Sequence, residues 1–108
     1  MTTVPSVTPS LGEPPRYSLT LFVSGASGLS ARAIIDTRAM CESALANSYE
    51  LAVIDVHINP AIAVARGIIA TPTLVRSRPL PERKHVGSVS PTGGVLAALG
   101  LTHGDTDR

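Results

Sequence analysis

Few residues of this chain have the types and spacing that catalysis or metal binding requires. The three histidines stand far apart in the sequence, and none has a cysteine at metal-ligand spacing: His57, His85 and His103. Gly25 and Gly28 cannot form a phosphate-binding loop, which needs a longer glycine spacing followed by Lys and Ser or Thr. No serine stands in a nucleophile motif. We therefore expect no catalytic residue, no metal and no cofactor.

Cys41 is the single cysteine, so the chain cannot make an internal disulfide, which fits a reducing compartment. It falls on the apolar stripe of a predicted helix. We interpret it as a small buried hydrophobic residue.

Composition indicates one small domain, because the chain has 108 residues and is 44% hydrophobic but only 3% aromatic. A core of Val, Ile, Leu and Ala implies modest stability, so we expect self-association into a dimer or tetramer. The net charge is +1, and the only basic cluster is too loose to predict nucleic-acid binding: Arg76, Arg78, Arg83 and Lys84. No secretory signal and no membrane-length apolar run is visible, so we expect a cytoplasmic protein without membrane contact.

The two ends lack apolar periodicity. Residues 1–15 are rich in Thr, Ser and Pro, and residues 102–108 are polar. We expect flexible tails at 1–15 and 102–108, flanking one domain at 16–101.

Residues 17–23 alternate apolar and polar side chains, which predicts a strand. Small residues at 24–28 end it. A helical stripe then runs from 30 to about 46 through Ile34, Cys41 and Leu45, with Ile35 close beside it. Either Ser27 or Ser30 can cap the first turn.

Residues 50–58 are apolar on both alternating faces, which predicts a central strand parallel to the first. Asn59 and Pro60 then open a short helix that ends near Gly67. Strands at 73–75 and 85–89 follow, and Ser90-Pro91 opens a last helix with Val95, Leu96 and Leu99 on its face.

This order of elements is that of the thioredoxin fold, an α/β fold, and right-handed crossovers predict that the first three strands are parallel and the fourth antiparallel. A redox enzyme of this fold needs Cys-x-x-Cys in the turn after the first strand, and residues 25–30 contain no cysteine. Thr71-Pro72 stands where thioredoxin-like proteins carry a cis-proline, so we expect a cis bond there.

The segment from Ile54-Asp55-Val56 through Asn59-Pro60 to Ala70–Leu74 is the most informative stretch of the chain. It resembles the KaiB family. Further similarity is found at 21–25, at 79–84, at 86–87 and at 99–101, so the resemblance covers roughly residues 17–101. One of three expected successive prolines is missing, and Ser88 stands where an Asp is usual.

The resemblance implies a thioredoxin-like regulatory protein that binds a KaiC-like hexameric RecA-type ATPase and helps to reset its phosphorylation cycle. By position, the partner-binding residues should be those that end the second strand and open the next helix: Val56, His57, Ile58, Asn59, Pro60 and Ala61. Asn59 and Pro60 are equally explained as plain helix starters.

The family also has a second, self-associating fold in which the half after Gly67 is rearranged. The candidate residues for such a switch are those of the proline-rich segment and the following turn: Thr71, Pro72, Pro79, Pro81 and Gly87. Two other functions stay open: a KaiB-type sensory or adaptor module that acts in trans with a histidine kinase or in a stress-response pathway, and a thioredoxin-like redox enzyme.

Overall fold

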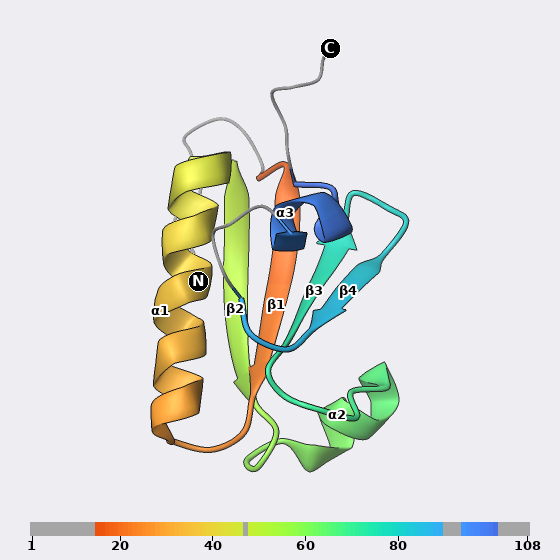
Figure 1. The fold of residues 1–108 in the computed structure, drawn as a ribbon. Coiled ribbons are helices and arrows are strands. Elements are labelled where there is room, and N and C mark those ends of the chain that lie inside the picture. The colour runs from red at the N-terminus through yellow and green to blue at the C-terminus, as the bar shows by residue number, and fades with distance from the viewer. Residues whose placement is uncertain (1–14, 47, 90–93, 102–108) are drawn as a thin grey trace, which may run out of the picture.

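The computed structural model describes residues 15–46, 48–89 and 94–101. Along these residues the chain forms four strands and three helices in the order β1–α1–β2–α2–β3–β4–α3 (Figure 1). Their bounds are Tyr17–Val23 for β1, Gly28–Leu45 for α1, Tyr49–Asp55 for β2, Pro60–Arg66 for α2, Thr73–Arg78 for β3, Arg83–Val86 for β4 and Gly94–Leu99 for α3. The predicted order of elements is confirmed. Almost all of both proposed tails falls outside the described residues, so the domain boundaries stay a prediction.

The four strands form one sheet in the order β2-β1-β3-β4. β1 and β2 are parallel, with Tyr17 opposite Tyr49. β3 is antiparallel to β1, and β4 is antiparallel to β3. The prediction of three parallel strands was therefore wrong for β3.

A short α2 accompanies this reversal. Its seven residues span about 10 Å, whereas the seven residues of β2 span roughly 23 Å. The helix itself does not run back along the sheet to where β2 began. It stays beside the ends of the strands, and β3 starts there and runs in the opposite direction (Figure 1).

β2 is an edge strand, so its predicted central position was also wrong. Its residues are half-buried except Ala52, which is exposed. Apolar residues on both faces of a strand indicate that each face is at least partly covered. They do not indicate whether another strand pairs with each of its two edges. The strands with neighbours on both sides and buried residues on both faces are β1 and β3.

The main core lies between the sheet and the helices α1 and α3, which cover the same face (Figure 1). The alternating residues of β1 predicted to share a face all enter it: Tyr17, Leu19, Leu21 and Val23. Met40, Cys41, Leu45 and Leu99 meet them from the two helices. Phe22, on the opposite face of β1, is also fully buried.

α1 begins after Ser27, whose side-chain oxygen accepts a hydrogen bond of 3.1 Å from the Ser30 amide. Ser27, and not Ser30, is thus the cap. The buried positions along the helix recur every three or four residues, and Ile35 falls outside them with 60% of its surface exposed. Ile34 is half-buried, and Ile35, predicted close beside the stripe, is turned about 100° away from Ile34.

β4 lies earlier than predicted, because its register with β3 pairs Arg76 with Arg83 and Thr73 with Val86. The later residue Val89 is buried without belonging to the strand. α3 carries Val95 and Leu99 on its buried face, as predicted. The predicted cap at Ser90-Pro91 lies outside the described residues. Within the described ranges, no helix is long and apolar enough to cross a lipid bilayer.

Candidate protein-binding surface

The six residues predicted to bind a partner form one continuous surface at the end of β2 and the start of α2. Val56 is half-buried, and its amide donates a hydrogen bond of 2.8 Å to the Val23 carbonyl. The remaining five are exposed: His57, Ile58, Asn59, Pro60 and Ala61. Asn59 and Pro60 occupy the N-cap and first helical positions, although the Asn59 side chain makes no capping bond to the helix.

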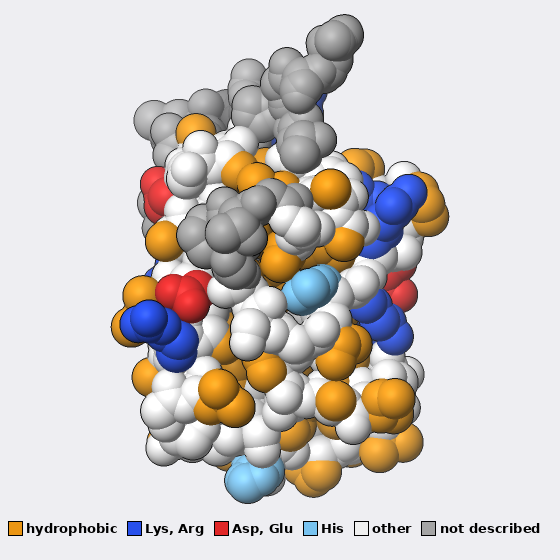
Figure 2. Space-filling view, in the orientation of Figure 1, with side chains coloured by type: hydrophobic (Ala, Val, Ile, Leu, Met, Phe, Trp, Pro, Cys, Tyr) orange, Lys and Arg blue, Asp and Glu red, His pale blue; other side chains and the backbone are white. Residues whose placement is uncertain are grey.

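Exposed apolar side chains extend this surface along α2 and beyond it. Ile58 is 74% exposed and Val64 is 82% exposed, while Ile69, after the helix, reaches 94%. Ile62 is exposed as well, and none of the seven residues of α2 is buried. Figure 2 shows hydrophobic side chains gathered at the lower right of the molecule, over α2. Grouped apolar exposure of this kind marks a contact surface more often than it does a free one.

Sequence reasoning missed Ile62, Val64 and Ile69. A signal was present, because residues two apart on a helix point about 200° away from each other. Ile62 and Val64 therefore cannot both face the sheet. At least one of them must point outward from a helix of this length.

Asp55 shapes the turn that presents the surface. Its side-chain Oδ1 accepts the Gly25 amide at 2.9 Å and the His57 amide at 2.8 Å. Its carbonyl oxygen accepts the amides of Ile58 and Asn59. The Gly25 bond, followed by the His57 bond, holds the pKa of the Asp55 carboxyl below its usual range. One carboxylate thus ties the turn after β1 to the turn after β2.

A second contact joins the same two turns. His57 Nε2 lies 3.0 Å from the hydroxyl oxygen of Ser24. Gly25 has φ of +71°, and a Cβ there would approach His57 Nδ1 to 3.2 Å. Only glycine satisfies both the backbone conformation and the close ring without strain.

In the turn after β1, where a thioredoxin carries its two redox cysteines, this chain has serine hydroxyl groups. Ser27 and Ser30 open α1 there, and a cavity of about 300 Å³ lies between this turn and Thr71-Pro72. The only thiol, Cys41, is 0% exposed in the core. Burial first, and then the charge of Glu42, raise the pKa of the Cys41 thiol to about 12. The arrangement offers no thiolate to a disulfide substrate at neutral pH.

The residues expected in a fold switch fall into two groups. The Thr71–Pro72 bond is cis, and the Pro72 carbonyl accepts the Gly87 amide at 2.8 Å, so these residues lie together. Pro79 and Pro81 also follow cis bonds, but they lie exposed in the loop between β3 and β4. Gly87 has φ of +112°.

The remaining candidate residues are dispersed. Arg76 of the basic cluster is buried, whereas Arg78, Arg83 and Lys84 are exposed, so the four do not share one surface. Among the described residues no group of three potential metal ligands is found. His57 lies in the turn after β2 and His85 lies in β4, and His103 is outside the described residues.

The element order, the sheet and the hydroxyl-lined turn define a thioredoxin-like α/β domain. The solved N-terminal domain of Synechococcus elongatus SasA is similar, with a TM-score of 0.61 and 25% identity over 76% of this chain and 77% of that one. Chloroplastic thioredoxin z shares the fold, with a TM-score of 0.63 at 17% identity over 80% of this chain and 77% of that one.

The sequence comparison identifies the family. The KaiB domain model matches residues 20–101. A circadian clock oscillator protein KaiB of Synechococcus elongatus is 39% identical over 89 residues, which are 82% of this chain and 87% of that protein. Its counterpart in Prochlorococcus marinus is 40% identical over 87 residues, covering 81% of this chain and 73% of that protein. The chain belongs to the KaiB family.

Proposed function

We propose that this protein is a regulatory subunit without catalytic activity that docks onto a KaiC-like hexameric RecA-type ATPase and modulates its phosphorylation and ATPase cycle. Membership of the KaiB family supports a role in clock-related regulation, since the curated relatives are named circadian clock oscillator proteins. The docking surface comprises the end of β2 and α2.

The observation that carries this proposal is the exposure of apolar residues along α2. A helix with exposed Ile62 and Val64 and no buried residue leaves apolar area in water that a partner would cover. Ile58 stands at the near end of the same surface. Burying a large aliphatic side chain contributes about 1.5–3 kcal/mol, which helps to offset the entropy lost on association.

Replacement of Ile58 by Glu tests the surface. The side chain is 74% exposed, so the variant should fold normally. A buried, unpaired carboxylate at the interface should weaken binding to a purified KaiC-type hexamer by roughly thirtyfold or more. Ile35→Glu is the matched control, because Ile35 is 60% exposed but lies on α1. Equal binding by wild type and Ile58→Glu would reject this docking surface.

A second candidate function is a KaiB-type sensory module that acts in trans with a histidine kinase. Its support is the likeness to the N-terminal domain of SasA. A pull-down with the isolated kinase, in the presence and absence of the ATPase, separates the two functions. Binding to the kinase alone would favour the sensory role.

We also propose that the half after Gly67 has a second, self-associating arrangement. An amide NMR spectrum recorded with and without the ATPase should then contain two slowly exchanging sets of peaks, and size-exclusion chromatography should report a dimer or tetramer. A single unchanging set of peaks from a monomer would contradict this proposal.

A further inference from the structure

α2 has an unusual attachment to the rest of the domain. None of its residues is fully buried, so packing of an apolar face contributes little to where the helix sits. The helix nevertheless ends at a defined point, where Gly67 adopts a left-handed conformation and its amide donates to the Val64 carbonyl. Asp55 fixes the turn before α2, and a second set of contacts holds the helix at its C-terminal end.

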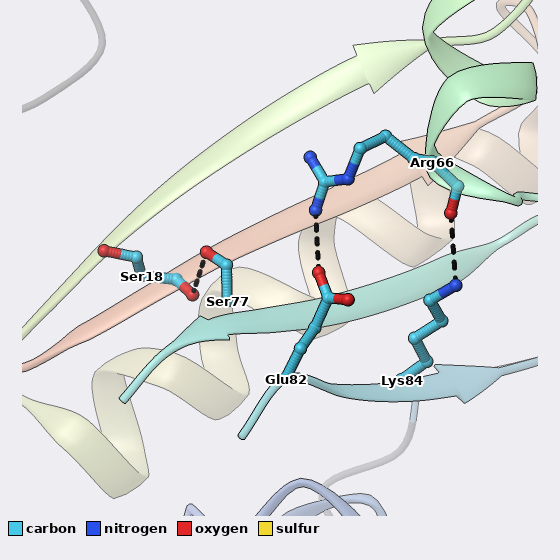
Figure 3. Close-up of polar contacts among 5 residues, drawn as sticks. All are labelled: Ser18, Arg66, Ser77, Glu82 and Lys84. Carbon is cyan, nitrogen blue, oxygen red and sulfur yellow. Dashed lines mark hydrogen bonds and ion pairs between the residues drawn. The ribbon is translucent and has the colours of Figure 1, made fainter. Parts of the chain in front are cut away.

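The first contact is an ion pair across the sheet. Arg66 Nη2 lies 3.1 Å from Glu82 Oε2, and Figure 3 shows the Arg66 side chain extending over the strands to reach it. On the way, Arg66 Cζ lies 5.8 Å from the centre of the Phe22 ring. Phe22 is fully buried, so the guanidinium group serves as part of the cover on this face.

The second contact involves the backbone of the same residue. Lys84, in β4, donates a hydrogen bond of 3.1 Å from Nζ to the Arg66 carbonyl oxygen (Figure 3). The last carbonyl groups of a helix lack partners within it, and a cation is favourable there. Arg66 is thus held at its side chain by Glu82 and at its backbone by Lys84.

We propose that Arg66, Glu82 and Lys84 form a polar clasp that positions α2 for partner binding. The clasp joins α2 to the β3–β4 loop and to β4, which are otherwise separate from the docking surface. By limiting the orientations of α2, it lowers the entropy that binding must remove. The inference rests on the proposed function, because it assigns positioning residues to that docking surface.

A double-mutant cycle on the ion pair tests the clasp. Arg66→Gln, Glu82→Gln and the double variant are compared with wild type by amide hydrogen exchange and by affinity for a purified KaiC-type hexamer. Each single variant should accelerate exchange at α2 and weaken binding by roughly two- to fivefold, the range expected of one exposed ion pair. Because the first substitution already opens the clasp, the second should add little.

Two further variants separate positioning from general stability. Lys84→Arg keeps the donor and should behave as wild type, whereas Lys84→Met should loosen α2. Exchange at β1 amides should stay unchanged in every variant, since the effect is local. The matched control is Asp36→Asn, which breaks the Arg32–Asp36 pair of 3.5 Å on α1 and should leave α2 untouched.

The two measurements can fail independently. Unchanged α2 exchange in Arg66→Gln and Glu82→Gln, or strictly additive effects in the double variant, would overturn the clasp whatever the partner. Faster amide exchange in α2 with unchanged affinity for the hexamer would show that the clasp does not position α2 for binding. Absence of binding by wild type itself would instead reject the proposed function, while the exchange data would still decide whether the clasp holds α2.

Discussion

Arg76 Nη1 donates a hydrogen bond of 2.8 Å to the Leu99 carbonyl oxygen, which joins β3 to the end of α3. Its Nη2 donates one of 2.7 Å to the Pro81 carbonyl. Arg76 is only 6% exposed, and no carboxylate is paired with it among the described residues. Backbone carbonyl groups therefore stabilise this buried charge. The same hydrogen bonds fix the positions of the end of α3 and of the β3–β4 loop.

Arg76→Lys should destabilise the fold by about 1–3 kcal/mol. The lysine keeps the charge, but a single ammonium group cannot reach both Pro81 and Leu99. One buried carbonyl then loses its partner. Urea unfolding followed by circular dichroism measures the loss, and an unchanged midpoint would show that the forked geometry is not needed.

Gly100→Ala should be more damaging than Gly67→Ala. Both glycines are left-handed, with φ of +65° and +69°, so both changes introduce backbone strain of about 1–2 kcal/mol. A Cβ at residue 100 would lie 2.7 Å from Arg76 Nη1, whereas one at residue 67 would be 3.6 Å from Lys84 Nζ. Arg76 cannot move aside without losing its own bonds, so about 1 kcal/mol should be added at residue 100. Equal unfolding free energies for the two variants would contradict this contact.

Asp55→Asn should lower stability at neutral pH and have little effect in acid. The pKa of Asp55 is lowered in the folded protein, so ionised Asp55 stabilises the fold above its usual pKa of 3.8. That stabilisation is lost as the pH falls through the lowered folded-state pKa. Unfolding curves of wild type and Asp55→Asn at several pH values should converge at low pH. If the stability difference between wild type and Asp55→Asn is the same at every pH, the effect comes from altered packing or hydrogen bonding and not from the charge of Asp55.

Cys41 should resist alkylation by iodoacetamide in the native protein and react once the protein is unfolded. Burial raises the pKa of its thiol from 9.0 to about 12, so no thiolate forms at neutral pH. The Cys41 thiol has a higher pKa in the folded protein than in the unfolded chain. Its contribution to stability is therefore complete below pH 9.0 and is lost as the pH rises towards about 12.

Insulin reduction gives a separate check on the redox alternative. We expect no turnover from wild type, and Cys41→Ser should behave in the same way. Turnover that depends on Cys41 would require the thiol to become exposed and would contradict the burial observed here.

Local chemistry was enough to predict the type and order of the elements, although not the bounds of β2 and β4. The alternation of Tyr17–Val23, the Asn59-Pro60 start and the Gly67 end each depend on the backbone preferences of one or two neighbouring residues, and the structure places each as expected. The sequence left Ser27 and Ser30 as alternative caps of α1, and the structure shows Ser27 in that role. The absence of a dithiol is equally a property of the chain. The six predicted partner-binding residues are contiguous in sequence, so they had to lie together.

Only the tertiary structure decided how these elements meet. The direction of β3 and the edge position of β2 follow from which strands pair, and strand pairing depends on contacts between residues far apart in the chain. The same is true of Arg76 with Leu99 and of Arg66 with Glu82. The periodicity of apolar residues indicates which side chains are buried, but not which distant residues contact them. The contacts of Arg66 at the end of α2 therefore could not be predicted from the sequence.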